Sequence, residues 1–191
     1  MEQIRLSEEE LCFLSENYPG LTYDKTENKI KGVFSFHRSY KGKTLKGVYS
    51  IEFKLEHSKT SILPKVRETC GKILNIAKRK NINPADIHLN SLEGDLCLIL
   101  GIKEKAVYPD GFDFKLFMNH IETHLYWVTY FERYDEKPWE DEPHNIEEAL
   151  IKAVKENKLY RKDYHEFLEK KLMRKLGRSV FRNILRKNKM L

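Results

Sequence analysis

Among the three cysteines of the chain, Cys97 has the most unusual setting. It follows Gly94 by three residues and Asn90 by seven, and His88 lies two residues before that asparagine. A glycine in a polar loop lets the backbone approach a thiol closely, and an asparagine amide can donate a hydrogen bond to the oxyanion that forms when a carbonyl is attacked. These residues predict a cysteine nucleophile and an oxyanion donor on one loop. On spacing alone, a small buried thiol between two leucines is the favoured interpretation.

The remaining cysteines and histidines carry weaker signals. Cys12, Cys70 and Cys97 are an odd number and lack CxxC spacing, so neither a disulfide framework nor a thiolate zinc site is expected. We expect structural roles for the first two. His120 and His124 are four residues apart, but an isoleucine stands where a HExxH zinc motif has its glutamate. Packing or surface roles are expected for both, and no metal or organic cofactor is expected.

Length and composition indicate a globular protein. The 191 residues are 40% hydrophobic and 12% aromatic, enough for one domain, or one domain with a short appendage. No apolar run approaches the roughly 18 residues that span a bilayer. The first ten residues are acidic and polar, whereas a signal peptide would be basic and then apolar. We therefore expect a cytoplasmic protein without a membrane partner.

The positive charge is concentrated at one end of the sequence. Residues 161–191 carry eleven Lys and Arg against three Asp and Glu, a net +8, which leaves −2 for the first 160 residues. The segment 132–148 before this tail holds eight acidic side chains. Nucleic acid is therefore not an expected partner of the main domain.

Hydropathy patterns predict the elements that must position the cysteine loop. Ser7 and Glu10 form a capping-box pattern that begins a helix ending before Pro19. The stretches 30–36 and 49–56 alternate in polarity and predict adjacent antiparallel strands with one solvent-facing side.

The later segments differ in how clearly their sequence predicts a helix or a strand. The segment 62–66 contains Pro64, so it is an edge strand or the start of a strand. Residues 72–80 fit a short helix or a third strand. Apolar residues three or four apart from Phe114 to Phe131 predict a helix packed on a sheet.

Two further helices are expected at 146–157 and about 162–188, the second broken near Gly177. The order of elements predicts an α+β fold with helices segregated from the sheet. We expect a main domain at 1–157 and a basic helical extension at 158–191. This extension would pack on the acidic segment or hold a partner.

The loop resembles the active site of ubiquitin-conjugating enzymes, which have the UBC fold. In that family a His-Pro-Asn tripeptide precedes the thioester-forming cysteine. The matching residues here are His88-Leu89-Asn90 and Gly94-Asp95-Leu96-Cys97-Leu98. With Leu89 in place of the proline, the chain looks more like the divergent bacterial relatives encoded beside cGAS-like nucleotidyltransferases (CD-NTases) in CBASS antiphage operons.

The resemblance implies a fold, a chemistry and a partner. The fold would be an N-terminal helix, an antiparallel meander, the cysteine loop and C-terminal helices. Cys97 would hold the C-terminal glycine of a CD-NTase, or of a ubiquitin-like protein, as a thioester, and an activating enzyme would be a further partner. Asn90 would stabilise the oxyanion and His88 would order the loop.

Three further residues are expected to bind the reacting partners. Gly94 would bring the loop close, Asp95 would steer an incoming amine, and Trp139, in the acidic loop, would dock a partner or close the edge of the core.

Two other functions remain open from the sequence. One is a UBC-fold adaptor that binds a partner through its surface and basic tail without covalent chemistry. It is distinguished by whether the Cys97 sulfur is accessible with the Asn90 amide nearby. The other is a nucleic-acid-binding module that uses residues 161–191, whose affinity would fall steeply with salt.

Overall fold

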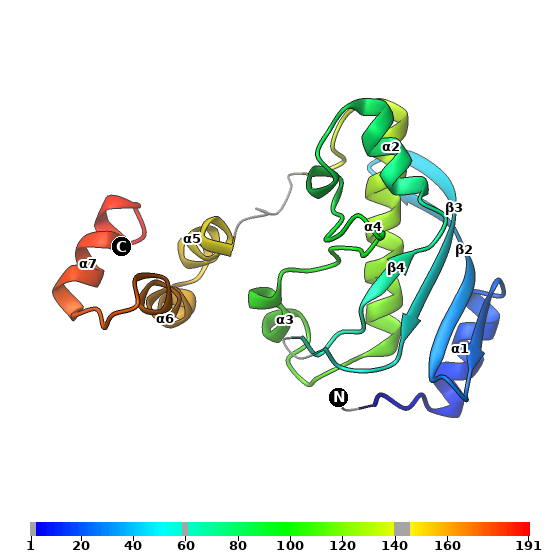
Figure 1. Cartoon of the computed structure of the whole chain (residues 1–191), viewed down its shortest axis with the longest axis horizontal. Coiled ribbons are helices and arrows are strands. Elements are labelled where there is room, and N and C mark those ends of the chain that lie inside the picture. The colour runs from blue at the N-terminus through cyan, green and yellow to red at the C-terminus, as the bar shows by residue number, and fades with distance from the viewer. Residues whose placement is uncertain (1–2, 59–60, 140–145) are drawn as a thin grey trace. The chain divides into compact units, whose positions relative to one another are not determined.

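The computed structural model describes residues 3–58, 61–139 and 146–191, which form two compact units, residues 1–140 and 141–191 (Figure 1). The expected division after residue 157 is corrected, because helix α5 (Ile146–Glu156) packs on elements of the second unit.

An antiparallel sheet of four strands in the order β1-β2-β3-β4 forms the first layer of the first unit. The strands are β1 (Leu21–Asp24), β2 (Lys29–Tyr40), β3 (Lys43–Lys54) and β4 (Val66–Glu68). The long hairpin of β2 and β3 confirms the two predicted strands. Its two turn residues, Lys41 and Gly42, both have positive φ, which matches the twist of the hairpin.

The edge strand β4 begins two residues after Pro64, as the proline requires. Glu68 at its end is 1% exposed, and its carboxylate accepts hydrogen bonds from the backbone N–H groups of Cys70, at 2.9 Å, and Ile73, at 3.2 Å. These bonds cap α2 (Lys72–Lys80), whose N-cap residue supplies no side-chain bond. Residues 72–80 are therefore a helix.

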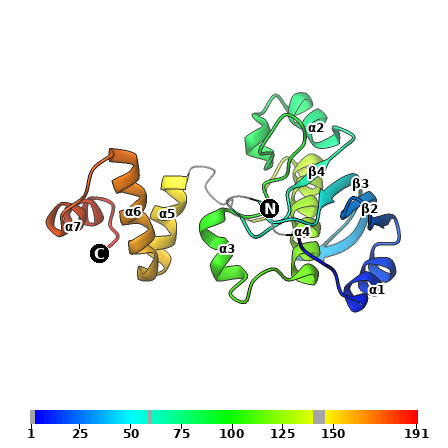
Figure 2. The same ribbon diagram turned by 60° about the horizontal axis from the view of Figure 1, so that its bottom comes forward.

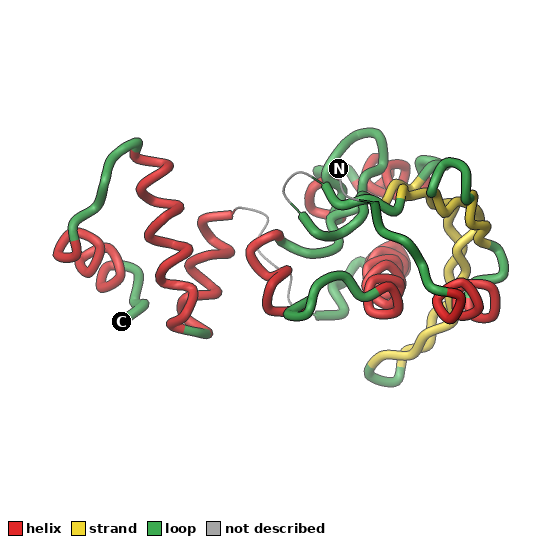
Figure 3. The backbone as a smooth tube through the Cα atoms, turned by 90° about the horizontal axis from the view of Figure 1, so that it is seen from below, coloured by secondary structure: helices red, strands yellow, loops and turns green. Residues whose placement is uncertain are grey.

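Helix α4 (Phe114–Tyr134) runs along the inner face of the sheet (Figure 3). Phe117 contacts Phe53 of β3 edge to face at 5.4 Å, and Thr129 shares a buried hydrogen bond with Tyr49 at 2.8 Å. Helix α1 (Glu8–Asn17) begins at Ser7 with the predicted capping box and packs against β1 and α4. The central helix is thus fixed on its sheet side by apolar and aromatic contacts.

A long connection, residues 81–113, contacts α4 away from the sheet. It contains a 3-10 turn, η1 (Pro84–Ile87), and a short helix, α3 (Gly101–Val107). The contacts with α4 involve His120, His124 and Trp127, which recur every three or four residues along one side of the helix. This connection carries the cysteine loop.

The second unit is a small helical bundle. It contains α5, the 3-10 turn η2 (Lys158–Tyr160), α6 (Arg161–Leu172) and α7 (Arg178–Lys187) (Figure 2). The predicted break near Gly177 is confirmed. Its buried apolar side chains include Leu150, Tyr164 and Leu185.

The structure confirms an α+β fold with an antiparallel sheet; UBC-likeness remains a prediction. Within the described ranges, no helix combines the length and the apolar character needed to cross a membrane.

Candidate active site

The structure brings the H-x-N tripeptide and the cysteine side by side. The Cys97 N–H donates to the His88 carbonyl at 2.8 Å, and the Asn90 N–H donates to the Asp95 carbonyl at 2.7 Å. Between these bonds, Leu89 and Leu96 form an antiparallel bridge. His88, Asn90 and Cys97 therefore belong to one short hairpin-like loop, as their spacing predicted.

His88 orients this loop through its backbone and its ring. It ends η1 with a positive φ of 60°, and its ring packs edge-on against Trp127 of α4 with a centroid distance of 4.5 Å. This agrees with the expected role in ordering the loop. The contact positions the start of the H-x-N tripeptide against the central helix.

Asn90 uses one amide hydrogen inside the loop. Its side chain donates to the Leu96 carbonyl at 3.2 Å, one residue before Cys97. No second acceptor for this amide occurs among the described residues. This bond holds the Asn90 side chain next to the cysteine segment. The contact observed for Asn90 therefore positions that side chain.

Cys97 is a partly exposed residue, and burial of its thiol raises the pKa of that thiol. Among the described residues, no cationic group opposes this effect. A raised pKa keeps the thiol protonated at neutral pH and lowers the fraction of thiolate, the nucleophilic form.

His124 contacts the cysteine loop, and the sequence did not predict this contact. Its ring forms a hydrogen bond with the Cys97 backbone, although the side chain is 7% exposed and Nε2 has no partner. The donor is therefore Nδ1, and the acceptor is the Cys97 carbonyl. Burial, with repulsion from His88, lowers the His124 pKa to about 3, so the ring stays neutral. The only sequence signal was its spacing from His120.

Asp95 is committed to the protein's own loop. It is 2% exposed, and its carboxylate accepts bonds from Lys65 at 2.8 Å, Arg67 at 3.1 Å and Ser91 at 2.5 Å. Burial alone would raise its pKa, but these partners overcome burial and lower it. The expected role in steering an amine is thus replaced by bracing the loop against β4.

Gly94 brings the loop close to β4, not to the thiol. Its φ is +94°, its carbonyl accepts from the Glu68 N–H at 2.9 Å, and an added Cβ would lie 2.2 Å from the Glu68 carbonyl oxygen. Only glycine fits this approach. The expected close approach was to the thiol, whereas the approach observed is to the edge strand β4.

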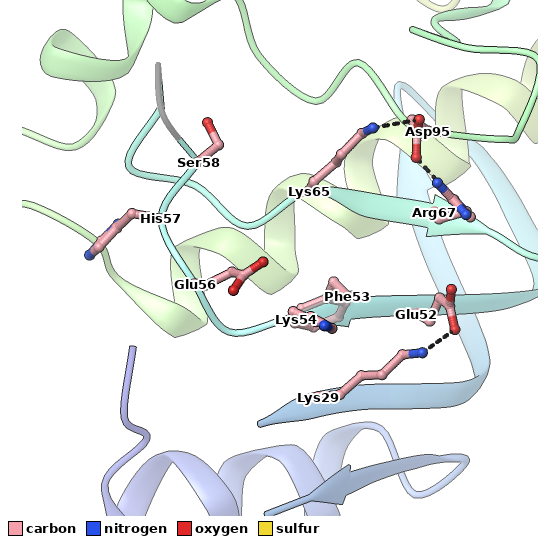
Figure 4. A pocket seen from close by; sticks show the side chains of 10 residues that line it. All are labelled: Lys29, Glu52, Phe53, Lys54, Glu56, His57, Ser58, Lys65, Arg67 and Asp95. Carbon is pink, nitrogen blue, oxygen red and sulfur yellow. Dashed lines mark hydrogen bonds and ion pairs between the residues drawn. The ribbon is translucent and has the colours of Figure 1, made fainter. Parts of the chain in front are cut away.

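Two adjoining grooves open beside the loop. One, of about 310 Å³, lies along β3 and β4, where Lys65 and Arg67 point toward Asp95 (Figure 4). The other, of about 420 Å³, is lined in part by Asn90 and by the leucines on either side of Cys97. Lys65 lines both grooves, whereas Cys97 lines neither. The second groove therefore leads to the Asn90 side chain.

Trp139, Cys12 and Cys70 lie outside the cysteine loop. Trp139 packs on Tyr40 and Tyr126, with centroid distances of 5.1 and 6.1 Å, so it closes the edge of the core. Cys12 and Cys70 are exposed, which corrects their expected structural roles.

His120 bonds to the Tyr108 hydroxyl at 2.7 Å, while His124 bonds to the Cys97 backbone, so the two histidines serve different contacts. Among the described residues, no group of three or more metal-ligating side chains is assembled.

No protein-family model, curated protein or solved structure matches this chain. The function is therefore inferred from the site itself.

Proposed function

We propose that the chain is a UBC-like acyl carrier that holds the C-terminal glycine of a partner protein as a thioester on Cys97. The observation that carries this proposal is the pairing of the tripeptide His88-Leu89-Asn90 with Leu96-Cys97. The order of helix, antiparallel sheet, cysteine loop and central helix supports it as well.

The proposed step is acyl transfer to the thiol. The Cys97 sulfur, after losing its proton to solvent, attacks the activated C-terminal carbonyl, and a carbon–sulfur bond forms. The bond between that carbonyl and its activating group then breaks, and the activating group leaves with the electron pair. A lysine amine or another thiol later takes the acyl group and releases Cys97.

The neighbouring residues divide the work between positioning and charge stabilisation. His88 and His124 hold the Cys97 backbone against α4. The second amide hydrogen of Asn90 is the proposed donor to the oxyanion, a contribution of about 2.7–4 kcal/mol for a well-placed group. Because the thiol pKa is raised, the donor must arrive already activated, as from an activating enzyme.

The proposed partner is a cytoplasmic CD-NTase that ends in glycine, with a ubiquitin-like protein as the alternative acyl donor. This assignment rests on the likeness of the loop to the bacterial relatives from antiphage operons. The proposed role is regulation of the nucleotidyltransferase through its C-terminus.

The test is intact-mass spectrometry of the protein with its operon neighbours and ATP. We expect an adduct that disappears with a thiol reductant and that is absent in Cys97→Ala. Cys70→Ala, which removes an exposed thiol, is the matched control and should retain the adduct. An adduct that survives both Cys97→Ala and reduction would reject the assignment.

A non-catalytic adaptor is the second candidate. It is favoured by the absence of a cation that lowers the pKa of Cys97 and by the commitment of Asp95 to Lys65 and Arg67. An adaptor would bind the partner with equal affinity before and after Cys97→Ala and would show no adduct with any activated donor.

A further inference from the structure

Helix α7 carries an exposed row of arginines for which the described residues supply no counter-charge. Arg178, Arg182 and Arg186 are exposed and follow one another at intervals of four residues. Among the described residues none of them forms an ion pair. Neighbouring basic groups do find partners, since Lys171 pairs with Glu147 and Lys175 with Glu169.

The lack of neutralisation follows from the sequence around the row. Residues 170–191 contain no Asp or Glu, and the first turn of α7 has no acidic residue. Like charges four residues apart on a helix destabilise it by a few tenths of a kcal/mol per pair. Within the described part of the acidic segment, Glu132 pairs with Arg79, Asp135 pairs with Lys80 and Glu147 pairs with Lys171.

Apolar side chains that flank the arginine row of α7 are already used within the second unit. Leu185 is 4% exposed, and the Phe181 ring packs edge-on against His165 at 4.5 Å. A helix that lies in a membrane surface needs its apolar side for the acyl chains. Apart from Val180, which is 45% exposed, the exposed surface of α7 is therefore polar.

That polar side has the composition of a phosphate-binding surface. Ser179 and Asn183 are exposed beside the arginine row, and such hydroxyl and amide groups contact phosphates and base edges alongside arginine. Four residues of helix rise about 6 Å, so the row extends about 12 Å. Duplex nucleic acid presents a phosphate about every 3.4 Å along each strand, so several phosphates fall within this length.

We propose that the arginine row of α7 binds the phosphate backbone of double-stranded nucleic acid. This activity is separate from the proposed acyl transfer on Cys97 and does not depend on it. Because the row contacts phosphates, binding is weakly sequence-dependent and falls steeply with salt.

The test measures binding of a mixed-sequence DNA duplex to the full chain by fluorescence anisotropy between 50 and 300 mM salt. The variant is Arg178→Gln, Arg182→Gln and Arg186→Gln together. The matched control is Lys25→Gln, Lys46→Gln and Lys78→Gln, which removes the same charge from exposed positions of the first unit. Circular dichroism establishes that both variants stay folded.

We expect the arginine variant to reduce the slope of log affinity against log salt by about 3 and the affinity by roughly tenfold or more, while the control leaves the slope nearly unchanged. Equal losses in both variants, or no salt-dependent binding by the wild type, would overturn the proposal. So would binding to phosphatidylserine vesicles or polyglutamate without binding to the duplex.

Discussion

At the residue scale, the reactivity of Cys97 is governed by burial. Burial raises its pKa above the ordinary value of 9.0, and the rate of alkylation follows the thiolate fraction. With Cys12→Ser and Cys70→Ser removing the exposed thiols, iodoacetamide labelling of Cys97 should become about tenfold faster for each pH unit from 7 to 9. A plateau near pH 7 would mean that a cation stabilises the thiolate.

His124 makes folding sensitive to acid. Its pKa is lowered from 6.5 to about 3 in the folded state, so its contribution to stability is fully present above pH 6.5 and is lost as pH falls toward 3. Each pKa unit corresponds to about 1.4 kcal/mol. Urea unfolding should therefore show a falling free energy of unfolding from pH 6.5 to 4.5.

In the variant His124→Asn, the amide replaces the Nδ1 donor without a titrating group. This variant should keep most of the stability at pH 7.5 and flatten the dependence between pH 6.5 and 4.5. His124→Leu should cost about 1–3 kcal/mol at pH 7.5, because the Cys97 carbonyl loses its donor. If the pH dependence of His124→Asn equals that of the wild type, another group is responsible.

The residues of the site differ in how far the sequence could predict them. The grouping of His88, Asn90 and Cys97 was predictable, because all three lie within one short loop. The contact of His124 with Cys97 depends on how α4 is rotated against residues 81–113, which no local spacing encodes. The salt bridges of Asp95 likewise depend on β4, so its burial could not be anticipated.

At the element scale, the cysteine loop is attached to β4 through Gly94. Gly94→Ala would place a Cβ 2.2 Å from the Glu68 carbonyl oxygen at a φ of +94°, and should cost at least about 1–3 kcal/mol. Gly101→Ala is the control, because its nearest neighbour would be 3.9 Å away. Thermal unfolding that is the same for both alanine variants would contradict this account.

The predictability of the elements followed their length and pattern. The hairpin of β2 and β3 was predictable from long alternation, and α4 from its apolar stripe. Strand β1 has four residues and α3 has seven, too few for a periodic signal, and neither was predicted. Residues 72–80 stayed ambiguous because their helix is capped by Glu68 from outside the segment.

At the scale of the whole molecule, the basic residues of the tail all belong to the second unit. The basic tail was predicted from composition, but its boundary was not, since α5 has an apolar side that could have packed on either unit. It packs with η2 and α6 in the second unit. The proposed acyl chemistry therefore belongs to the first unit and the arginine row to the second.

The proposed thioester on Cys97 is tested most directly by identifying the residue to which the partner is attached. In Cys97→Ser the proposed adduct becomes an oxygen ester that resists reductants, so peptide mass spectrometry can identify both partners. The account predicts a partner's C-terminal glycine esterified to residue 97. Attachment at Cys12 or Cys70, or no ester with an activated donor that loads the wild type, would contradict it.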